Sequence, residues 1–495
     1  MINAKLIAEG ALNESDILKY IINHDINNIQ KKNMQIGERY YNGEHDVLQK
    51  DFTTSRILES DEITGEQHCK LFRNVNRSNH KNINAFLKIL VDQKTAYLVS
   101  KEPTIRVTGA EDNTNKKAYE KMLCDFSDDT FHEMLQDLVI GASNKGFEAI
   151  HIYYDSYGKL QYCIVPANEI IAIYDTDNQK ELQEVIRYYD IVVVENGQEY
   201  TRKKVEWWTK HNVTYYIEKE KDLYMRDSNV KVNPSPHWWS ITNLDGFDKK
   251  RQGHSWGQVP FLILKNNRNS TTDLEHIKGL IDAYDLISSE GTNNFLDLVE
   301  LYWVIAGYGG ETANAIAKRL QINKAVLVSD ASGKVEAKQI ELPVSGRLEY
   351  LKMLRKDIFH FGMGIDTDSD KFGNAPSGIS LKFQYTLLDQ KAGNMISKLK
   401  KVIKELLWFV TDDYNRIHGT NYNAEDIIVD INKNIITNDV EIVNMIQSSK
   451  GIVSDKTLLA MHPFVTDVNA EMQEIEAEEK RTLEKFGTDM MSNVE

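Results

Sequence analysis

The sequence offers few side-chain arrangements that could carry out a reaction or hold a metal ion. Three aspartates alternate in Asp366-x-Asp368-x-Asp370, as acidic residues do at the start of a calcium-binding loop. Such a loop also needs glycine at its sixth position and glutamate at its twelfth, where this chain has Lys371 and Ser377. We therefore interpret the segment as a polar, solvated loop and predict no metal site.

Two catalytic motifs begin in the sequence but are not completed. His132-Glu133 opens like a zinc-protease motif, but Gln136 stands where a second histidine is required. Gly141-Ala142-Ser143 is not a nucleophile elbow, because Lys145 replaces the second glycine. The sequence also lacks a Walker A loop, which would cradle a phosphate. The chain is therefore predicted not to be an enzyme and to need no cofactor.

The composition is that of a globular protein. With 495 residues, of which 41% are hydrophobic, the chain is long enough for several domains around a substantial core. Its net charge of −15 argues against tight binding of DNA, because gripping phosphates requires a basic surface. The three cysteines form no CxxC pair and fit a reducing cytoplasm. We find no secretion signal and no run of the ~20 apolar residues that a membrane span needs.

The spacing of apolar residues divides the N-terminal half into a helical part and a β-rich part. Residues 1–50, about 82–99 and about 129–144 follow helical spacing. Between 147 and 265, short runs rich in β-branched and aromatic residues alternate with turn signals, which predicts an antiparallel sheet. The expected strands are Glu148–Tyr154, Leu160–Val165, Ile170–Tyr174, Glu184–Val194, Lys204–Thr209 and Thr214–Glu218.

Long helices dominate the C-terminal half. Thr272 and Glu275 form the sequence pattern of a capping box, and the apolar spacing behind them predicts a helix of roughly 28 residues, about 42 Å long. The acidic residues on this helix are expected to lie on its exposed face: Asp273, Asp282, Asp285, Glu290 and Asp297.

A second helix is predicted from about Ser345 to Phe361, with a small α/β tip between it and the first. Glycines and a proline interrupt helicity from Gly362 to Gly378. Beyond them a helix of about 40 residues runs to Gly419, which suits a C-terminal cap. Two short helices are expected at 438–450 and 454–461, followed by an acidic, Glu-rich end.

The order of these elements and several sequence stretches resemble the portal proteins of long-tailed phages that infect Gram-positive bacteria. The resemblance extends from about residue 36 to 467. It is carried by RYYNGEHDVL (39–48), NRSNHKNINAFLKILVDQKTAYLVSKEP (76–103), SNKGFEAIHIYYD (143–155), VPANEIIAIYD (165–175), VIRYYD (185–190), WGQVPFLILKNN (256–267), DLEHIKGLIDAYDLISS (273–289) and SGISLKFQYTLLDQKA (377–392).

The resemblance implies an α+β portal fold with wing, stem, clip and crown. Carried over by position, it divides the chain into a wing at 1–270, helical first and β-rich from about 147, stem helices at 271–301 and 344–361, a clip at 302–343, a tunnel loop at 362–378, a long helix at 379–423, a crown at 424–470 and an acidic flexible tail at 471–495.

The resemblance also implies a function and a set of partners. Such proteins form rings, usually of twelve subunits, at one capsid vertex, where double-stranded DNA passes through the channel during packaging and ejection. The implied partners are the terminase large subunit, the major capsid and scaffolding proteins, and a head-completion adaptor. The implied location is the virion, with assembly in the host cytoplasm.

The DNA-facing part of the channel would be the tunnel loop. Its expected DNA-facing residues are Gly364, Asp366, Asp368, Asp370, Lys371, Gly373 and Gly378. The loops of this family are often richer in glycine, so the aspartates here are a departure. Two other classes of function remain open: a metal-dependent hydrolase using Asp366, Asp368 and Glu341, and an intracellular scaffold built on long helices.

Overall fold

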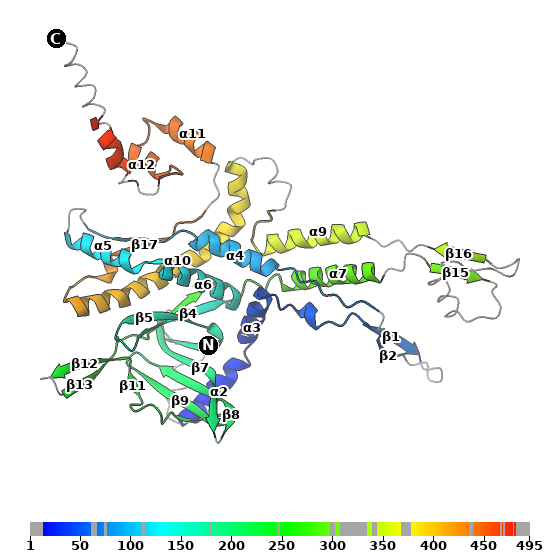
Figure 1. Ribbon diagram of the computed structural model, residues 1–495, viewed down its shortest axis with the longest axis horizontal. Coiled ribbons are helices and arrows are strands. Elements are labelled where there is room, and N and C mark those ends of the chain that lie inside the picture. The colour runs from blue at the N-terminus through cyan, green and yellow to red at the C-terminus, as the bar shows by residue number, and fades with distance from the viewer. Residues whose placement is uncertain are drawn as a thin grey trace, which may run out of the picture. The chain divides into compact units, whose positions relative to one another are not determined.

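The computed structural model describes residues 13–60, 67–73, 77–109, 114–175, 177–178, 181–195, 197–244, 248–297, 302–306, 334–338, 344–367, 378–434, 439–465, 468, 471–478 and 480–481 (Figure 1). Its residues group into two compact units. The first comprises Met1–Asp92 and Leu138–Gly362, and the second comprises Gln93–Asp137 and Met363–Glu495. Two helices, α4 (Phe86–Val99) and α6 (Asp129–Lys145), contribute residues to both units.

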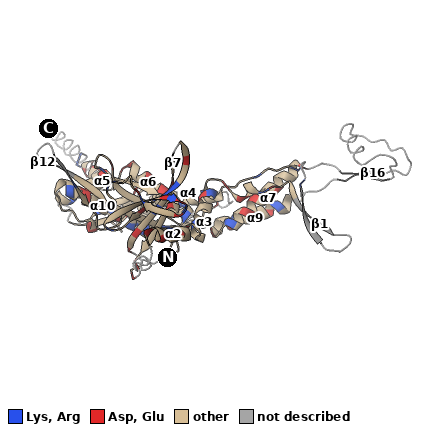
Figure 2. Ribbon diagram, turned by 90° about the horizontal axis from the view of Figure 1, so that it is seen from below, with Lys and Arg blue, Asp and Glu red and all other residues tan. Residues whose placement is uncertain are grey.

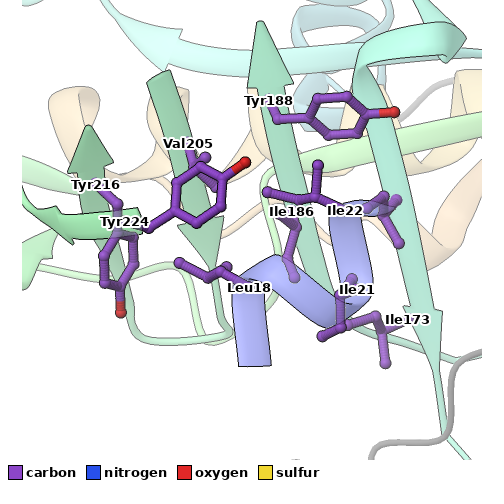
Figure 3. Close-up of a cluster of buried hydrophobic side chains, with 10 residues drawn as sticks. Leu18, Ile21, Ile22, Ile173, Ile186, Tyr188, Val205, Tyr216 and Tyr224 are labelled. Atoms are coloured by element: carbon purple, nitrogen blue, oxygen red, sulfur yellow. The ribbon is translucent and has the colours of Figure 1, made fainter. Parts of the chain in front are cut away.

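The first unit begins with two helices, α2 (Glu14–Ile26) and α3 (Ile29–Tyr41). Each starts at an asparagine whose side chain accepts a hydrogen bond from the first turn, which satisfies one amide that would otherwise have no partner. Helix α2 covers one face of a sheet with its apolar side (Figure 3). The residues of this cluster are Leu18, Ile21, Ile22, Ile171, Ile173, Ile186, Tyr188, Val205, Tyr216 and Tyr224.

The strands of the β-rich region pair antiparallel, as predicted, but they form separate sheets. The larger sheet has the order β10-β9-β8-β7-β6, and a short strand β11 pairs with β9. Its strands are β6 (Ile170–Tyr174), β7 (Leu182–Glu195), β8 (Gln198–Trp208), β9 (Asn212–Glu220), β10 (Leu223–Arg226) and β11 (Ser235–Pro236). A second sheet has the order β14-β4-β5, made of β14 (Phe261–Lys265), β4 (Phe147–Tyr154) and β5 (Leu160–Val165).

Two hairpins form further two-stranded sheets in this unit. They are β1–β2 (Thr54–Ser60 and Gln67–Arg73) and β12–β13 (Trp238–Leu244 and Asp248–His254). The tryptophans of the β-rich region are buried to different degrees. Trp208 is buried, whereas Trp239 is 37% exposed.

Two helices that are far apart in the sequence lie side by side, α7 (Lys278–Leu296) and α9 (Val344–Phe361) (Figures 1 and 2). Acidic and basic residues lie along α9, whereas α7 carries acidic residues along its length and its basic residue, Lys278, at its start (Figure 2). Strands β15 (Tyr302–Ala306) and β16 (Lys334–Lys338) pair antiparallel in the segment between the two helices. The second helix matches its predicted bounds, but the first is shorter than predicted, with 19 residues beginning at Lys278.

The second unit is built on α10 (Gly378–His418), a helix of 41 residues. Its apolar side is buried at Met395, Leu399 and Leu406, and Gly419 follows the helix with a positive φ of 65°, as the predicted cap requires. Helix α5 (Thr114–Phe126) and an antiparallel pair, β3 (Thr104–Val107) with β17 (Ile427–Asp430), belong to the same unit. The short helices α11 (Asp439–Ser449) and α12 (Asp455–Ala460) confirm the two predicted near the C-terminus.

The chain therefore combines helices and sheets, as the α+β class requires. The finer division into wing, stem, clip and crown stays a prediction.

Candidate functional site

The predicted tunnel loop starts at a glycine that cannot easily be replaced. The amide of Gly362 donates to the carbonyl of Ile358 (2.8 Å), which closes the last turn of α9. A β-carbon at this position would lie 2.6 Å from that carbonyl oxygen and 2.6 Å from Cδ1 of Leu90. Both distances are too short for any side chain, so the end of α9 packs against α4 only with glycine here.

We predict that Gly362→Ala destabilises the protein by about 1–3 kcal/mol, the usual cost of overpacking a filled site. Gly346→Ala is the matched control, because a β-carbon at Gly346, inside α9, would meet nothing within 4 Å. That second change should stabilise the helix by up to about 1 kcal/mol, since alanine is the better helix former. Denaturant midpoints of both variants check the prediction, and a loss of equal size in both would contradict it.

A glutamine side chain fixes the next part of the loop to α4, within the second unit. Gln93 Nε2 donates to the carbonyl of Ile365 (2.7 Å), and the amide of Ile365 donates to Gln93 Oε1 (3.0 Å). The Ile365 side chain is buried. Met363 just before it has a φ of 55°, a left-handed conformation that side chains other than glycine seldom adopt. The described beginning of the loop is thus held against α4 by these two hydrogen bonds and by the burial of Ile365.

The structure places only some of the predicted loop residues. Gly364 and Asp366 follow Met363 in the described part, and Gly378 is the first residue of α10. Asp368, Asp370, Lys371 and Gly373 lie outside the described residues, and so do Glu341 and Ser377. The assignment of these residues to the channel stays a prediction.

The predicted capping box at Thr272 and Glu275 does not cap a helix that starts there. Glu275 Oε1 does accept the amide of Thr272 (3.1 Å), but residues 273–277 form turns, and α7 has Ile277 at its N-cap without a capping side chain. The amide of Asp273 donates to the carbonyl of Ser143 (2.9 Å), which binds this residue to the end of α6 instead of to a helical turn. The interpretation of Thr272 as the helix cap was therefore wrong.

The prediction that Asp285 lies on an exposed acidic face was also wrong. Its side chain is 1% exposed, and Oδ2 lies 2.5 Å from Nδ1 of His45, which is fully buried. Oδ1 accepts both the backbone amide (2.9 Å) and the side-chain amide (2.8 Å) of Asn84. The other ring nitrogen of His45 lies 3.1 Å from the carbonyl of Tyr40. Both ring nitrogens of His45 therefore have a polar partner, and the ring is held between Asp285 and the Tyr40 carbonyl.

More charged groups surround this ion pair. Lys278 Nζ lies 2.5 Å from Asp46 and 2.7 Å from Asp282, and the Tyr40 hydroxyl donates to Asp282. Partial burial alone would raise the pKa of Asp46, but hydrogen bonds from Lys278 and Arg39 outweigh it and lower the pKa to about 2. Burial and the bond to Asp282 raise the pKa of Tyr40. This cluster joins α3 to α7.

The buried carboxylate of Glu148 explains why a glycine stands at the start of the incomplete nucleophile motif, Gly141-Ala142-Ser143. Glu148 is almost fully buried, lies 2.5 Å from Lys145 and accepts the amide of Ala167 (2.7 Å). Burial raises the pKa of Glu148 to about 7, against the opposing effect of Lys145. A β-carbon at Gly141 would lie 2.0 Å from Glu148 Oε2, so the glycine makes room for this carboxylate. The Ser143 hydroxyl donates to the carbonyl of Val139 (2.6 Å), which is a structural role.

Among the described residues, no group of three or more His, Cys, Asp or Glu side chains could hold a metal ion. Cys124 and Cys163 are free thiols. Within the described part of the chain, no helix has both the length and the apolar character to cross a membrane.

Comparison with known proteins identifies the family. The model of the family described as "Phage portal protein, SPP1 Gp6-like" matches residues 18–485. The chain belongs to this portal protein family. The portal protein of Bacillus phage SPP1 is 31% identical over 455 residues, which cover 91% of this chain and 84% of that protein. The portal protein of Clostridium phage phiCD119 is 30% identical over 464 residues, covering 89% and 91%. The resemblance seen in the sequence is therefore confirmed.

Proposed function

We propose that this portal protein forms a closed ring, usually of twelve subunits, at one vertex of the phage capsid. The ring would be the channel through which double-stranded DNA is packaged and later ejected. The protein would act in the virion after assembly in the host cytoplasm, as a structural subunit without catalytic activity. Membership of the portal family and the pairing of α7 with α9 support this proposal.

The observation that carries the proposal is the apolar surface that a single chain leaves uncovered on this helix pair. Leu348, Tyr350 and Met353 of α9 are 52%, 45% and 48% exposed. At the end of α7, Phe295 and Leu296 are 55% and 56% exposed. These large apolar side chains are exposed on the single chain, and contact with another protein would remove them from water. We infer that a second copy of the chain covers them in the ring.

The direct test is the size of the purified protein in the absence of nucleic acid and nucleotide. Size-exclusion chromatography with light scattering should give a closed assembly near a dozen subunits, and negative-stain microscopy should show rings. A helical scaffold or a small hydrolase would not give a closed ring. A monodisperse monomer at micromolar concentration over several salt conditions would refute the proposal.

We predict that the double variant Leu348→Ser, Met353→Ser weakens ring assembly. Burying each of these side chains contributes about 1.5–3 kcal/mol, and the loss recurs at every subunit contact. The matched control is Lys352→Ser, an exposed polar position on the same helix. Light scattering should show dissociation of the double variant at protein concentrations where the control remains assembled. Intact rings of the double variant with an unchanged dissociation concentration would exclude these two side chains from the contact.

The remaining parts of the proposal concern partners. The segment 302–343, which includes β15 and β16, would be the clip on which the terminase large subunit docks, to be replaced later by a head-completion adaptor. The major capsid and scaffolding proteins would surround the ring in the shell. The tunnel loop at 362–378 would face the DNA, where one lysine among aspartates gives weak and salt-sensitive contact with phosphates.

We predict that Lys371→Ala leaves ring formation intact and changes the amount or the retention of packaged DNA. Deletion of residues 367–373 should have a larger effect in the same assay, because it removes Asp368 and Asp370 as well and shortens the loop. The measurement is infectious yield and encapsidated genome length in phage carrying each variant. Normal packaging by phage with the deletion would remove the loop from the mechanism.

A further inference from the structure

A short extended segment lies along the buried side of α7. Its backbone amides form hydrogen bonds with side chains of that helix in a single register. Residues Ser78–Asn84 have no helix or strand of their own, and every second backbone amide donates to a side chain of α7 or of the residue that follows it. The four bonds are Ser78 to Asp297 (2.8 Å), His80 to Asn293 (2.7 Å), Asn82 to Ser289 (2.9 Å) and Asn84 to Asp285 (2.9 Å). We call Ser78–Asn84 the strap.

The repeat follows from the dimensions of the two structures. Two residues of extended chain advance about 6.6–6.8 Å, and four residues of helix advance about 6.0 Å. Alternate amides of the strap therefore stay in step with acceptors spaced four apart on α7. The intervening residues point elsewhere: Asn79 Oδ1 accepts the amide of Phe52 (3.0 Å), and Lys81 Nζ donates to the carbonyl of Leu48 (2.6 Å).

The two ends of the strap are held unequally. At the Asn84 end, Asp285 is buried, is bonded to His45 and accepts both the backbone and the side-chain amide of Asn84. In the middle, Ser289 and Asn293 are neutral and buried. At the Ser78 end, the side chain of Asp297 is 27% exposed, so water competes for its hydrogen bond.

We propose that the strap detaches from α7 from its Ser78 end only. Its Asn84 end remains bound to α7 through the Asp285–His45 pair. The strap joins β2 to α4, so detachment at the Ser78 end frees the β1–β2 hairpin from α7 while α4 stays in place. The device sets how far this hairpin can move relative to α7. The inference does not depend on ring formation or on contact with DNA.

Hydrogen exchange resolved to single residues in the assembled wild-type protein tests the direction. Protection of the strap amides should rise in the order Ser78, His80, Asn82, Asn84, with at least about tenfold between the first and the last. Equal protection of all four amides, or the reverse order, would overturn the proposal. No variant is needed for this measurement, so a failure to fold cannot obscure it.

The variant Asn293→Ala tests whether the Ser78 end of the strap detaches independently of the Asn84 end. It removes the acceptor of the His80 amide and the donor to the His80 carbonyl (3.0 Å). Exchange at Ser78 and His80 should accelerate by about tenfold or more, while Asn84 changes less than twofold (about the scatter expected for a distant site). The matched control, Asn294→Ala, changes the next residue of the same helix and should leave the strap unchanged. Equal acceleration at Asn84, or the same effect in the control, would overturn the proposal.

Discussion

Replacing Asp285 by alanine should destabilise the protein by about 3–5 kcal/mol, the usual cost of removing one partner from a buried ion pair. The change would leave the His45 ring buried beside Tyr40 without its carboxylate. It would also leave two donors of Asn84, its backbone and side-chain amides, without the oxygen that accepts them. Each uncompensated buried donor adds to the loss.

The matched control for this prediction is Asp297→Ala, at the other end of the same row of side chains. Asp297 also accepts a backbone amide, that of Ser78, but its side chain is 27% exposed, so its loss should cost about 1 kcal/mol or less. Chemical denaturation of both variants gives the comparison. A double-mutant cycle with His45→Ala should give a coupling energy well above the scatter of about 0.5 kcal/mol found for independent sites. Equal losses from the two aspartate variants would contradict the assignment of Asp285 to a buried ion pair.

Asp285 also explains one limit of the sequence analysis. Helical spacing separates apolar from charged positions, and a charged position is normally solvated, so Asp285 was assigned to the exposed face. The partners that permit its burial are His45 and Asn84, which are 240 and 201 positions away in the sequence. Periodicity within one helix contains no information about such distant donors.

The elements that could be predicted are those whose signals are local. The long helix α10 has a continuous apolar seam and a glycine in the required conformation just after it, and both are present in the sequence itself. The strands from β4 to β9 were found from short apolar runs between turns. The pairing of β3 with β17 joins Val107 to Ile427, and no local pattern indicates it.

The candidate site was predictable only in outline. The glycines identified the loop that begins at Gly362, but not the pair of hydrogen bonds by which Gln93 holds Ile365. The Thr272–Glu275 pattern predicted a capping box at the start of a helix. Glu275 does accept the amide of Thr272, but the helix begins later, at Lys278, and the backbone of Ser143 binds Asp273. Tertiary hydrogen bonds decided both cases.

The second large effect concerns acid. His151 lies on β4, where its ring stacks on Phe261 (centroids 4.5 Å apart) and meets the edge of Trp208 (4.7 Å). Burial lowers the pKa of His151 to about 3, with further effects from Arg187 and His237. No described residue forms a hydrogen bond with its Nε2. The folded protein therefore keeps this ring neutral at pH values where the unfolded chain protonates it.

The sign of the pH dependence follows from these two states. Above pH 6.5, the ordinary pKa of histidine, neither state binds the proton and His151 has no effect on pH dependence. Below it the unfolded state binds one more proton, so the free energy of unfolding falls by about 1.4 kcal/mol per pH unit until the folded pKa is reached. By pH 4.5 the loss from this one residue should be roughly 3 kcal/mol.

We predict that His151→Phe removes this loss while keeping an aromatic ring among Phe261 and Trp208. Denaturant midpoints measured at pH 7 and pH 4.5 should differ less in the variant than in the wild type, by the equivalent of about 2–3 kcal/mol. The control His276→Phe makes the same replacement at an exposed position and should retain the wild-type difference. His237, whose pKa burial lowers to about 4, still titrates in the variant, so acid sensitivity should be reduced and not abolished. If wild type and His151→Phe lose the same stability between the two pH values, His151 is protonated in the folded protein and the β4 site is not the acid-sensitive one.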